Sequence, residues 1–156
     1  MYAQSTINVS GRLSLVLTSE DGAQHAIELG SNTLCQPFLN ALSAWSTGAN
    51  NTGQNPTSPP VSFILGTGTG TPSVSDAALF APQTGTQTTI STRTASGSTT
   101  TYSINYTKGQ LTGTFTEGGL QDNSNNLMSH LVFQSSVNIL NTEAATFIYT
   151  ITFNAG

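Results

Sequence analysis

Leucine occupies every second position just before residue 18, and a similar alternation resumes after a short polar turn. His25, Ile27 and Leu29 lie on the far side of that turn, which contains Asp21-Gly22. A period of two places alternate side chains on one face of a β-strand. Asp-Gly between two alternating runs is among the strongest short-range signals for a hairpin. We therefore expect a leading β-hairpin within residues 1–30.

Residues 33–46 form the one stretch whose apolar positions recur every three or four residues, as in an amphipathic helix. The apolar stripe consists of Leu34, Phe38, Leu42 and Trp45. Pro37 falls in the first turn, where its missing N–H costs little, and Asn32 or Thr33 can cap the helix. We interpret Trp45 as a core residue at the end of the stripe.

A polar loop is predicted over residues 46–60, because its Gly, Asn and Pro residues leave no apolar period. Beyond it, in residues 61–156, short runs rich in Thr, aromatic and β-branched residues alternate with turn residues. The predicted strands lie at residues 61–65, 88–94, 102–106, 111–115, 127–133 and 146–153. Many short strands at regular spacing are typical of sandwiches and barrels. We predict a single domain over residues 1–156, all-β with one short helix, built as an antiparallel β-sandwich or a jelly-roll-like barrel.

Charged residues make up 6% of the 156 residues, and the formal net charge is −4. Roughly a quarter of the residues are charged in ordinary soluble proteins. The three cations Arg12, Arg93 and Lys108 cannot neutralise a run of phosphates, which argues against nucleic acid and against an anionic membrane as partners. A neutral surface suits a protein that packs among copies of itself or on a larger particle, or a secreted β-domain. The lack of charges to guard strand edges favours an obligate assembly.

The first ten residues, MYAQSTINVS, have neither the positive charge nor the apolar stretch of a signal peptide. No apolar run in the sequence approaches the roughly 20 residues of a membrane span. We therefore expect a chain that is made in the cytoplasm and stays soluble.

Two short blocks of sequence resemble a pattern in small structural proteins of tailed bacteriophages and prophages. The first, GTGTGTPSVSDAAL, runs from Gly66 to Leu79 and follows the apolar strand at residues 61–65. The second, FTEGGLQD, runs from Phe115 to Asp122. They match G-T-G-T-x-x-P-x-x-x-D-x-x-L and F-x-E-x-G-L-x-D, in the order in which the phage proteins carry them.

The resemblance spans residues 33–153 and implies a virion protein in which Glu117 of the second block has a structural role. The chain departs from the pattern at Gly118, where Ala is common, and at Gln121, where an aromatic residue is common. In the first block, Ser75 or Asp76 can cap a short helical turn.

Residues with catalytic or ligand-binding potential are few and isolated. Cys35 is the single cysteine, so no internal disulfide forms, and we expect a buried thiol. His25 and His130 belong to no metal-binding pair and are interpreted as structural. Glu117 and Asp122 flank two glycines, where a turn or bulge is expected. The loop that begins at Asp122 is interpreted as a polar hairpin loop, with Ca²⁺ binding as the alternative.

The glycine-rich block lacks the spacing of a dinucleotide-binding or phosphate-binding loop, and no serine-nucleophile motif is present. We predict no enzyme activity, no cofactor and no catalytic, cofactor-binding or metal-binding residue. The expected function is that of a multicopy structural protein of a tailed-phage virion, on the tail, baseplate or fibre-attachment apparatus or as a capsid decoration protein. Its partners would be copies of itself and other virion proteins. The alternative is a carbohydrate- or receptor-binding module for a host-surface glycan, with exposed Tyr102 and Tyr106 as the stacking platform; core packing is the other interpretation of those two rings.

Overall fold

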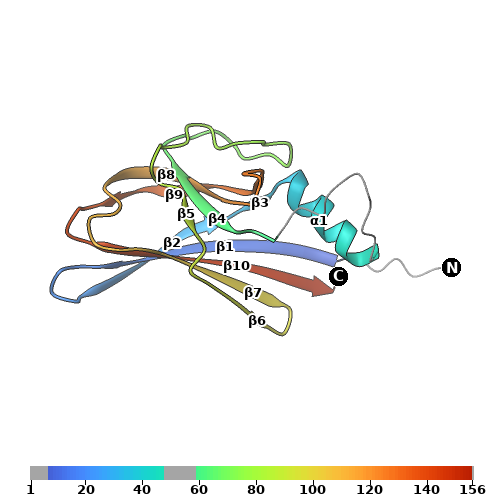
Figure 1. Cartoon of the computed structure of the whole chain (residues 1–156), viewed down its shortest axis with the longest axis horizontal. Coiled ribbons are helices and arrows are strands. Elements are labelled where there is room, and N and C mark those ends of the chain that lie inside the picture. The colour runs from blue at the N-terminus through green and yellow to red at the C-terminus, as the bar shows by residue number, and fades with distance from the viewer. Residues whose placement is uncertain (1–6, 48–58, 156) are drawn as a thin grey trace.

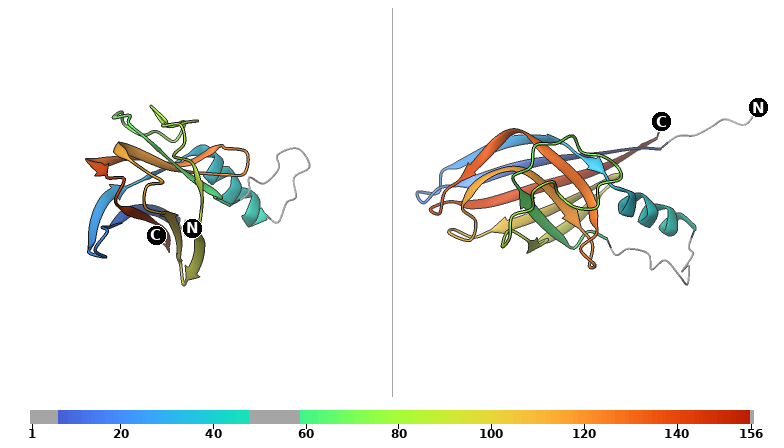
Figure 2. Two further views of the ribbon diagram at one scale, coloured as in Figure 1. Left: turned by 60° about the vertical axis from the view of Figure 1, so that its left-hand side comes forward. Right: turned by 90° about the horizontal axis from the view of Figure 1, so that it is seen from above.

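The computed structural model describes residues 7–47 and 59–155. Its elements are β1 (Ile7–Thr18), β2 (Gln24–Ser31), β3 (Thr33–Leu34), α1 (Gln36–Thr47), β4 (Ser62–Gly66), β5 (Thr88–Thr89), β6 (Thr92–Ser96), β7 (Thr99–Tyr106), β8 (Gly113–Gln121), β9 (Leu127–Ile139) and β10 (Ala144–Ala155). They form two antiparallel sheets of five strands and one helix (Figures 1 and 2). The predicted fold class is confirmed, and of its two forms the β-sandwich is the one observed.

The first sheet has the strand order β2-β1-β10-β7-β6, so the first and last strands of the described chain pair at its centre. β1 and β10 pair along their whole length, from Ile7 opposite Ala155 to Thr18 opposite Ala144. The predicted hairpin is confirmed, and Gly22 at its turn has a φ of 84°, which suits glycine.

The second sheet has the order β3-β9-β8-β4-β5. Its inner face packs on that of the first sheet, and the rings of Phe63 in β4 and Phe147 in β10 meet there with centroids 5.1 Å apart. The longer strands of both sheets contribute alternate residues to this core over much of their length, such as Leu13, Leu15 and Leu17 of β1, as expected from strand geometry.

The helix begins at Gln36, three residues later than predicted. Thr33 and Leu34 pair with β9 as a short strand, and the Cys35 N–H donates to the Met128 carbonyl. Thr33 and Leu34, which the periodicity assigned to the first helical turn, therefore pair with β9 as a strand instead. Pro37 lies in the first turn, as predicted.

The interpretation of Trp45 as a core residue is wrong, because 45% of it is exposed. The first turns of α1 bury Phe38 and Ala41, but the helix then runs away from the sandwich (Figure 1), and Trp45 lies near its far end. Of the polar loop predicted over residues 46–60, residues 48–58 lie outside the described part of the chain.

The strand predicted over residues 88–94 is divided into β5 and β6, which belong to different sheets. Between them Ile90 is buried and its N–H donates to the Val61 carbonyl, while the Ser91 N–H donates to the Ser103 carbonyl. The chain thus crosses from the second sheet to the first at Ile90 and Ser91, and this crossing closes one side of the sandwich.

Candidate functional site

The segment between β4 and β5, residues 67–87, lies over the outer face of the second sheet (Figure 1) and is called the outer loop below. Side chains alternate across β4, so Phe63 points into the main core while Ile64 points out beneath the loop. Ile64 packs there against a second, small apolar cluster of Cys35, Leu79 and Leu127. The outer loop therefore has a core of its own, separate from the interior of the sandwich.

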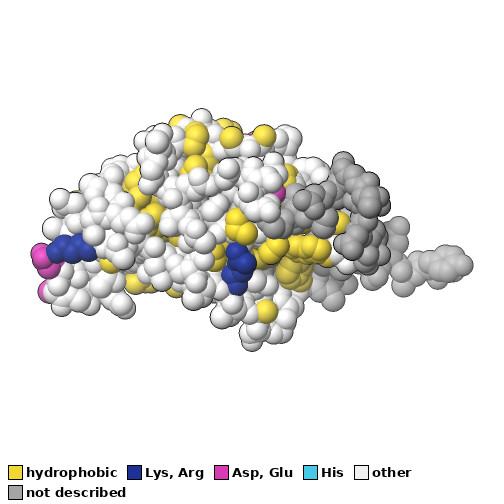
Figure 3. All heavy atoms as spheres, in the orientation of Figure 1, with side chains coloured by type: hydrophobic (Ala, Val, Ile, Leu, Met, Phe, Trp, Pro, Cys, Tyr) yellow, Lys and Arg dark blue, Asp and Glu magenta, His cyan; other side chains and the backbone are white. Residues whose placement is uncertain are grey.

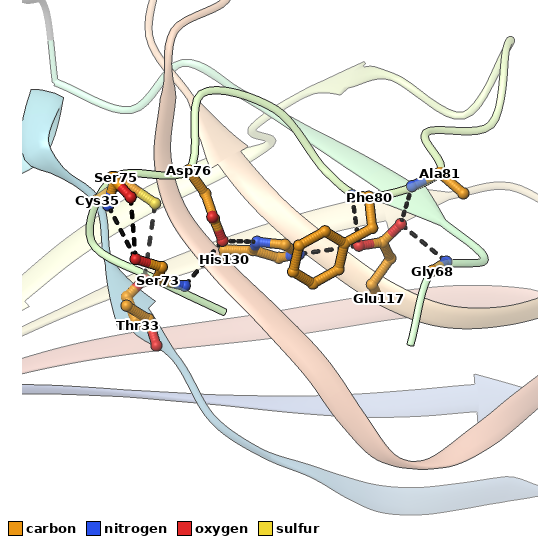
Figure 4. A network of polar contacts seen from close by, with 10 residues as sticks. All are labelled: Thr33, Cys35, Gly68, Ser73, Ser75, Asp76, Phe80, Ala81, Glu117 and His130. Carbon is orange, nitrogen blue, oxygen red and sulfur yellow. Dashed lines mark hydrogen bonds and ion pairs between the residues drawn. The ribbon is translucent and has the colours of Figure 1, made fainter. Parts of the chain in front are cut away.

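His130 of β9 lies beneath the outer loop, between two carboxylates (Figure 4). Its Nδ1 is 2.6 Å from Oδ2 of Asp76, and its Nε2 is 2.8 Å from Oε2 of Glu117. The side chains of His130 and Glu117 are fully buried, and that of Asp76 is 15% exposed. The ring of Phe80 covers the imidazole with centroids 4.6 Å apart.

Glu117 ties two parts of the outer loop to β8, one near the start of the loop and one at Phe80 and Ala81. Its Oε1 accepts hydrogen bonds from the backbone N–H groups of Gly68, at 2.9 Å, and Ala81, at 2.7 Å. Its Oε2 accepts from the Phe80 N–H at 3.0 Å in addition to the imidazole. Burial alone would raise the pKa of Glu117, but these hydrogen bonds favour the carboxylate and hold the pKa below its ordinary value of 4.5.

Asp76 closes a turn in the outer loop and reaches His130 with the same oxygen. Its Oδ2 accepts from the Ser73 N–H at 2.9 Å, and the Asp76 N–H donates to the Ser73 carbonyl. Partial burial opposes ionisation, but the bonds from Ser73 and His130 hold the pKa of Asp76 below 3.8. The helical turn predicted here is wrong, since residues 67–87 contain no helix. The Asp76 carboxylate caps a turn of the outer loop and also bonds to His130, which lies 54 residues further along the chain.

The alternating glycines at the end of β4 and the start of the outer loop leave room for Glu117. A Cβ on Gly66 would lie 2.4 Å from Oε1 of Glu117 and 2.6 Å from the Ala81 carbonyl oxygen. A Cβ on Gly68 would lie 2.4 Å from Cβ of Phe80. The threonine between these glycines is exposed. The Gly-Thr repeat thus places its backbone against the buried carboxylate and its hydroxyl side chains in solvent.

The arrangement holds the loop in place and leaves no ring nitrogen free for acid–base chemistry. Each nitrogen of the His130 ring is within hydrogen-bond distance of one carboxylate. Asp76 and Glu117 lie on opposite sides of the ring and do not converge on one point. Within residues 7–47 and 59–155, no three His, Cys, Asp or Glu side chains are arranged to hold a metal ion.

The two histidines predicted to be structural differ. His130 is buried and has a partner on each ring nitrogen, which confirms that interpretation. His25 is exposed on the edge strand β2, where it supports no core, so for it the interpretation is wrong.

The interpretation of the loop that begins at Asp122 as a polar hairpin loop is confirmed. Oδ1 of Asp122 accepts from the N–H groups of Ser124 and Asn126, at 2.8 and 2.9 Å, and Oδ2 accepts from the Asn126 side chain. Asn125 has a φ of 63°, which Asn tolerates in a turn. The carboxylate of Asp122 is therefore already used by its own loop.

The two glycines between Glu117 and Asp122 lie within β8, so the turn expected there is absent, although the pairing with β9 is irregular on both sides of them. A Cβ on Gly118 would lie 2.8 Å from Cζ of the buried Phe63. Phe63 fills the space that an alanine at residue 118 would need, which gives a physical reason for this departure from the phage pattern.

Cys35 is fully buried, as predicted. Burial, together with the negative charge of Asp76, raises the pKa of its thiol to about 12. We expect iodoacetamide to alkylate the folded protein roughly a thousandfold more slowly than the denatured chain, because the thiolate is the reactive form and the thiol is covered. Mass spectrometry of timed samples measures this ratio. Rapid stoichiometric labelling without denaturant would contradict it.

Acid is expected to weaken the attachment of the outer loop. The pKa values of Glu117 and Asp76 are lower in the folded chain than in the unfolded chain. Their stabilisation is therefore complete above the ordinary values of 4.5 and 3.8, and it is lost as the pH falls through the folded values. Urea unfolding midpoints between pH 7 and pH 3 should show this fall.

The Glu117→Gln variant should show a shallower fall with pH, whereas Glu28→Gln, which changes an exposed acid of β2, should follow the wild type. Equal pH dependence of Glu117→Gln and the wild type would show that the buried carboxylate is not responsible.

No family model, curated protein or solved structure matches this chain. Among the described residues, no helix combines the length and the apolar character that a membrane crossing requires.

Proposed function

We propose that the chain is a non-enzymatic structural protein of a tailed-phage virion, present in many copies. Its place would be on the tail, baseplate or fibre-attachment apparatus, or on the capsid as a decoration protein, after synthesis in the bacterial host cytoplasm. The observation that carries the proposal is that the two blocks that resemble the phage pattern meet in one buried arrangement around His130.

Several residues of the two blocks have a role in building the fold. Asp76 and Glu117, one from each block, bind the same imidazole. Gly66 and Gly68 make room for the second of these acids. The remaining apolar positions of the pattern are buried in the two cores: Leu79, Phe115 and Leu120. The two blocks together thus specify how the outer loop is attached to the second sheet. A structural protein has to maintain such an attachment.

The surface supports repeated contacts between subunits. In Figure 3 most of the visible surface belongs to neutral side chains and backbone, with charges in a few small groups. Hydroxyl and amide groups cost less to desolvate than ions and can bond to a neighbour, so such a surface can be buried over large areas.

The alternative function depended on Tyr102 and Tyr106, and their platform is not available. The two residues are 6% and 3% exposed, and the Tyr106 hydroxyl donates to the Thr86 carbonyl at 2.5 Å. Both rings are therefore core residues. A hollow of about 310 Å³ on the first sheet is lined by Ser10, Gly11, Arg12, Ser31, Thr150 and Thr152. It has hydroxyl groups but no aromatic ring on which a sugar could stack.

The test is quantitative mass spectrometry of phage particles purified from a host that carries this gene. We expect the chain in a fixed ratio of many copies per particle, unchanged by a second round of banding in a density gradient. Its presence in the lysate together with its absence from banded particles would overturn the proposal. Titration with a glycan array would then test the alternative.

A further inference from the structure

β6 forms an outer edge of the first sheet that no described strand covers (Figures 1 and 2). It is the one strand of the described chain in which all residues are exposed. An edge strand of this kind presents a row of backbone N–H and C=O groups that can bond to another strand.

The other three edges are shortened or irregular. β3 and β5 have two residues each. β2 carries the charged Glu28, pairs with β1 through a register shift, and lies against Gln134 of β9 at Gly30. β6 pairs with β7 in unbroken register and contains no Pro, Gly or acidic residue. Features that protect a sheet edge from pairing are thus present on β2, β3 and β5, whereas β6 has only the charge of Arg93.

The β6–β7 hairpin determines which backbone groups point to the free side. Ser96 and Thr99 close a two-residue turn that begins with Gly97, whose φ is 55°. The residues that close such a turn bond to each other, and bonded and non-bonded pairs then alternate along an antiparallel ladder. The backbone groups of Arg93 and Ala95 therefore point away from β7.

We propose that two copies of the chain pair through β6, antiparallel, about a two-fold axis at Thr94. This inference rests on the proposed function, because both require copies of the chain to associate. It adds the place at which two copies meet. Arg93 of each copy then faces Ala95 of the other, and the free groups of these residues form four backbone hydrogen bonds. The two five-stranded sheets join into one sheet of ten strands.

Charge selects this register over its neighbour. A shift that kept the bonding pattern but moved the axis to Arg93 would place two arginines opposite each other, and like charges directly opposite destabilise a sheet. With the axis at Thr94, the Thr94 side chains of the two copies face each other on the outer face of the joined sheet. This pair extends a cross-strand row that runs from Thr94 through Thr101 to Thr150 within one subunit, and Thr–Thr pairs are favourable.

The paired segment is at most the five residues of β6, so the dimer is expected to form reversibly and to depend on concentration. Sedimentation equilibrium of the full chain at low salt measures it. Ala95→Pro removes an edge-facing N–H and leaves the bonds to β7 intact, so this variant should stay monomeric. Ala95→Ser keeps the N–H and should dimerise as the wild type does.

Two further variants test the register, and they do not depend on whether the proline is tolerated. Ala95→Asp places a carboxylate opposite Arg93 of the second copy, twice per dimer, and should tighten dimerisation by roughly 2- to 30-fold. Ala95→Lys places a like charge there and should weaken it by a similar factor. Added salt should reduce both changes.

A mass that rises with concentration and responds to the Asp and Lys variants in opposite directions supports pairing through β6. A monomer at every concentration, in the wild type and in Ala95→Asp, overturns it. An oligomer that is indifferent to all four changes also overturns it, because assembly then uses another surface. Particle mass spectrometry decides separately whether the chain is a virion component, so failure of the β6 contact can be distinguished from failure of the proposed function.

Discussion

Replacing Glu117 by Leu is expected to lower the free energy of unfolding by about 3–5 kcal/mol, because each buried donor left without its acceptor costs about 1–3 kcal/mol. The carboxylate accepts four hydrogen bonds, three from the backbone of the outer loop and one from His130. Leucine accepts none of them, so the N–H groups of Gly68, Phe80 and Ala81 and the imidazole lose their acceptor together. Urea unfolding followed by circular dichroism measures the change.

A graded series separates lost hydrogen bonds from lost packing. Glu117→Gln keeps one acceptor oxygen but puts an NH₂ group against at least one of the backbone donors, so its cost should fall between those of the wild type and the leucine variant. Glu28→Leu, at an exposed site on β2, should change stability by no more than about 0.5 kcal/mol. The alkylation rate of Cys35, which packs beneath the loop with Leu79, should rise in the order wild type, Gln, Leu. A leucine variant as stable as the wild type would mean that the loop is held by its apolar contacts alone.

The parts of the fold predicted from the sequence are those fixed by neighbouring residues. Alternation on both sides of Asp21-Gly22 was sufficient for the leading hairpin, and alternation of aromatic and Thr residues was sufficient for the last strand. A period of two is imposed by the strand itself and by having one face buried, so it is visible without knowing the partner strand.

The arrangement around His130 could not be predicted in this way, because its members are far apart in the chain. His130 lies 54 residues from Asp76 and 13 from Glu117. Taken singly, none of these three residues belongs to a local sequence pattern of metal ligands or catalytic groups. The signal that could have connected them is a lone histidine in an apolar strand, together with one acid in each block, since a buried imidazole requires polar partners. Trp45 was misjudged for a similar reason, because helical period does not show where a helix leaves the sheet that it packs on.

The alternation of glycine with threonine from Gly66 onward has a testable physical cause. Neither Gly66 nor Gly68 has the positive φ that favours glycine, so the requirement at these positions is space. Gly97 is the reverse case, with a φ of 55° and open space where an added Cβ would lie. We expect Gly66→Ala to cost about 3 kcal/mol, the upper part of the range for overpacking, because one of its two clashes is with backbone. Gly97→Ala should cost about 1–2 kcal/mol through its backbone conformation alone.

Combining each substitution with Glu117→Gln in a double-mutant cycle separates these two causes. Oε1 of Glu117 is the atom nearest to the added Cβ at Gly66, so the two changes share a contact and their costs should not add. Gly97 lies in the β6–β7 turn of the other sheet, and its cost should add to that of Glu117→Gln within about 0.5 kcal/mol. Additive costs at Gly66 would mean that the Ala81 carbonyl alone limits the space there. Coupled costs at Gly66 would show that the Gly-Thr repeat and the buried acid of the second block form one structural unit.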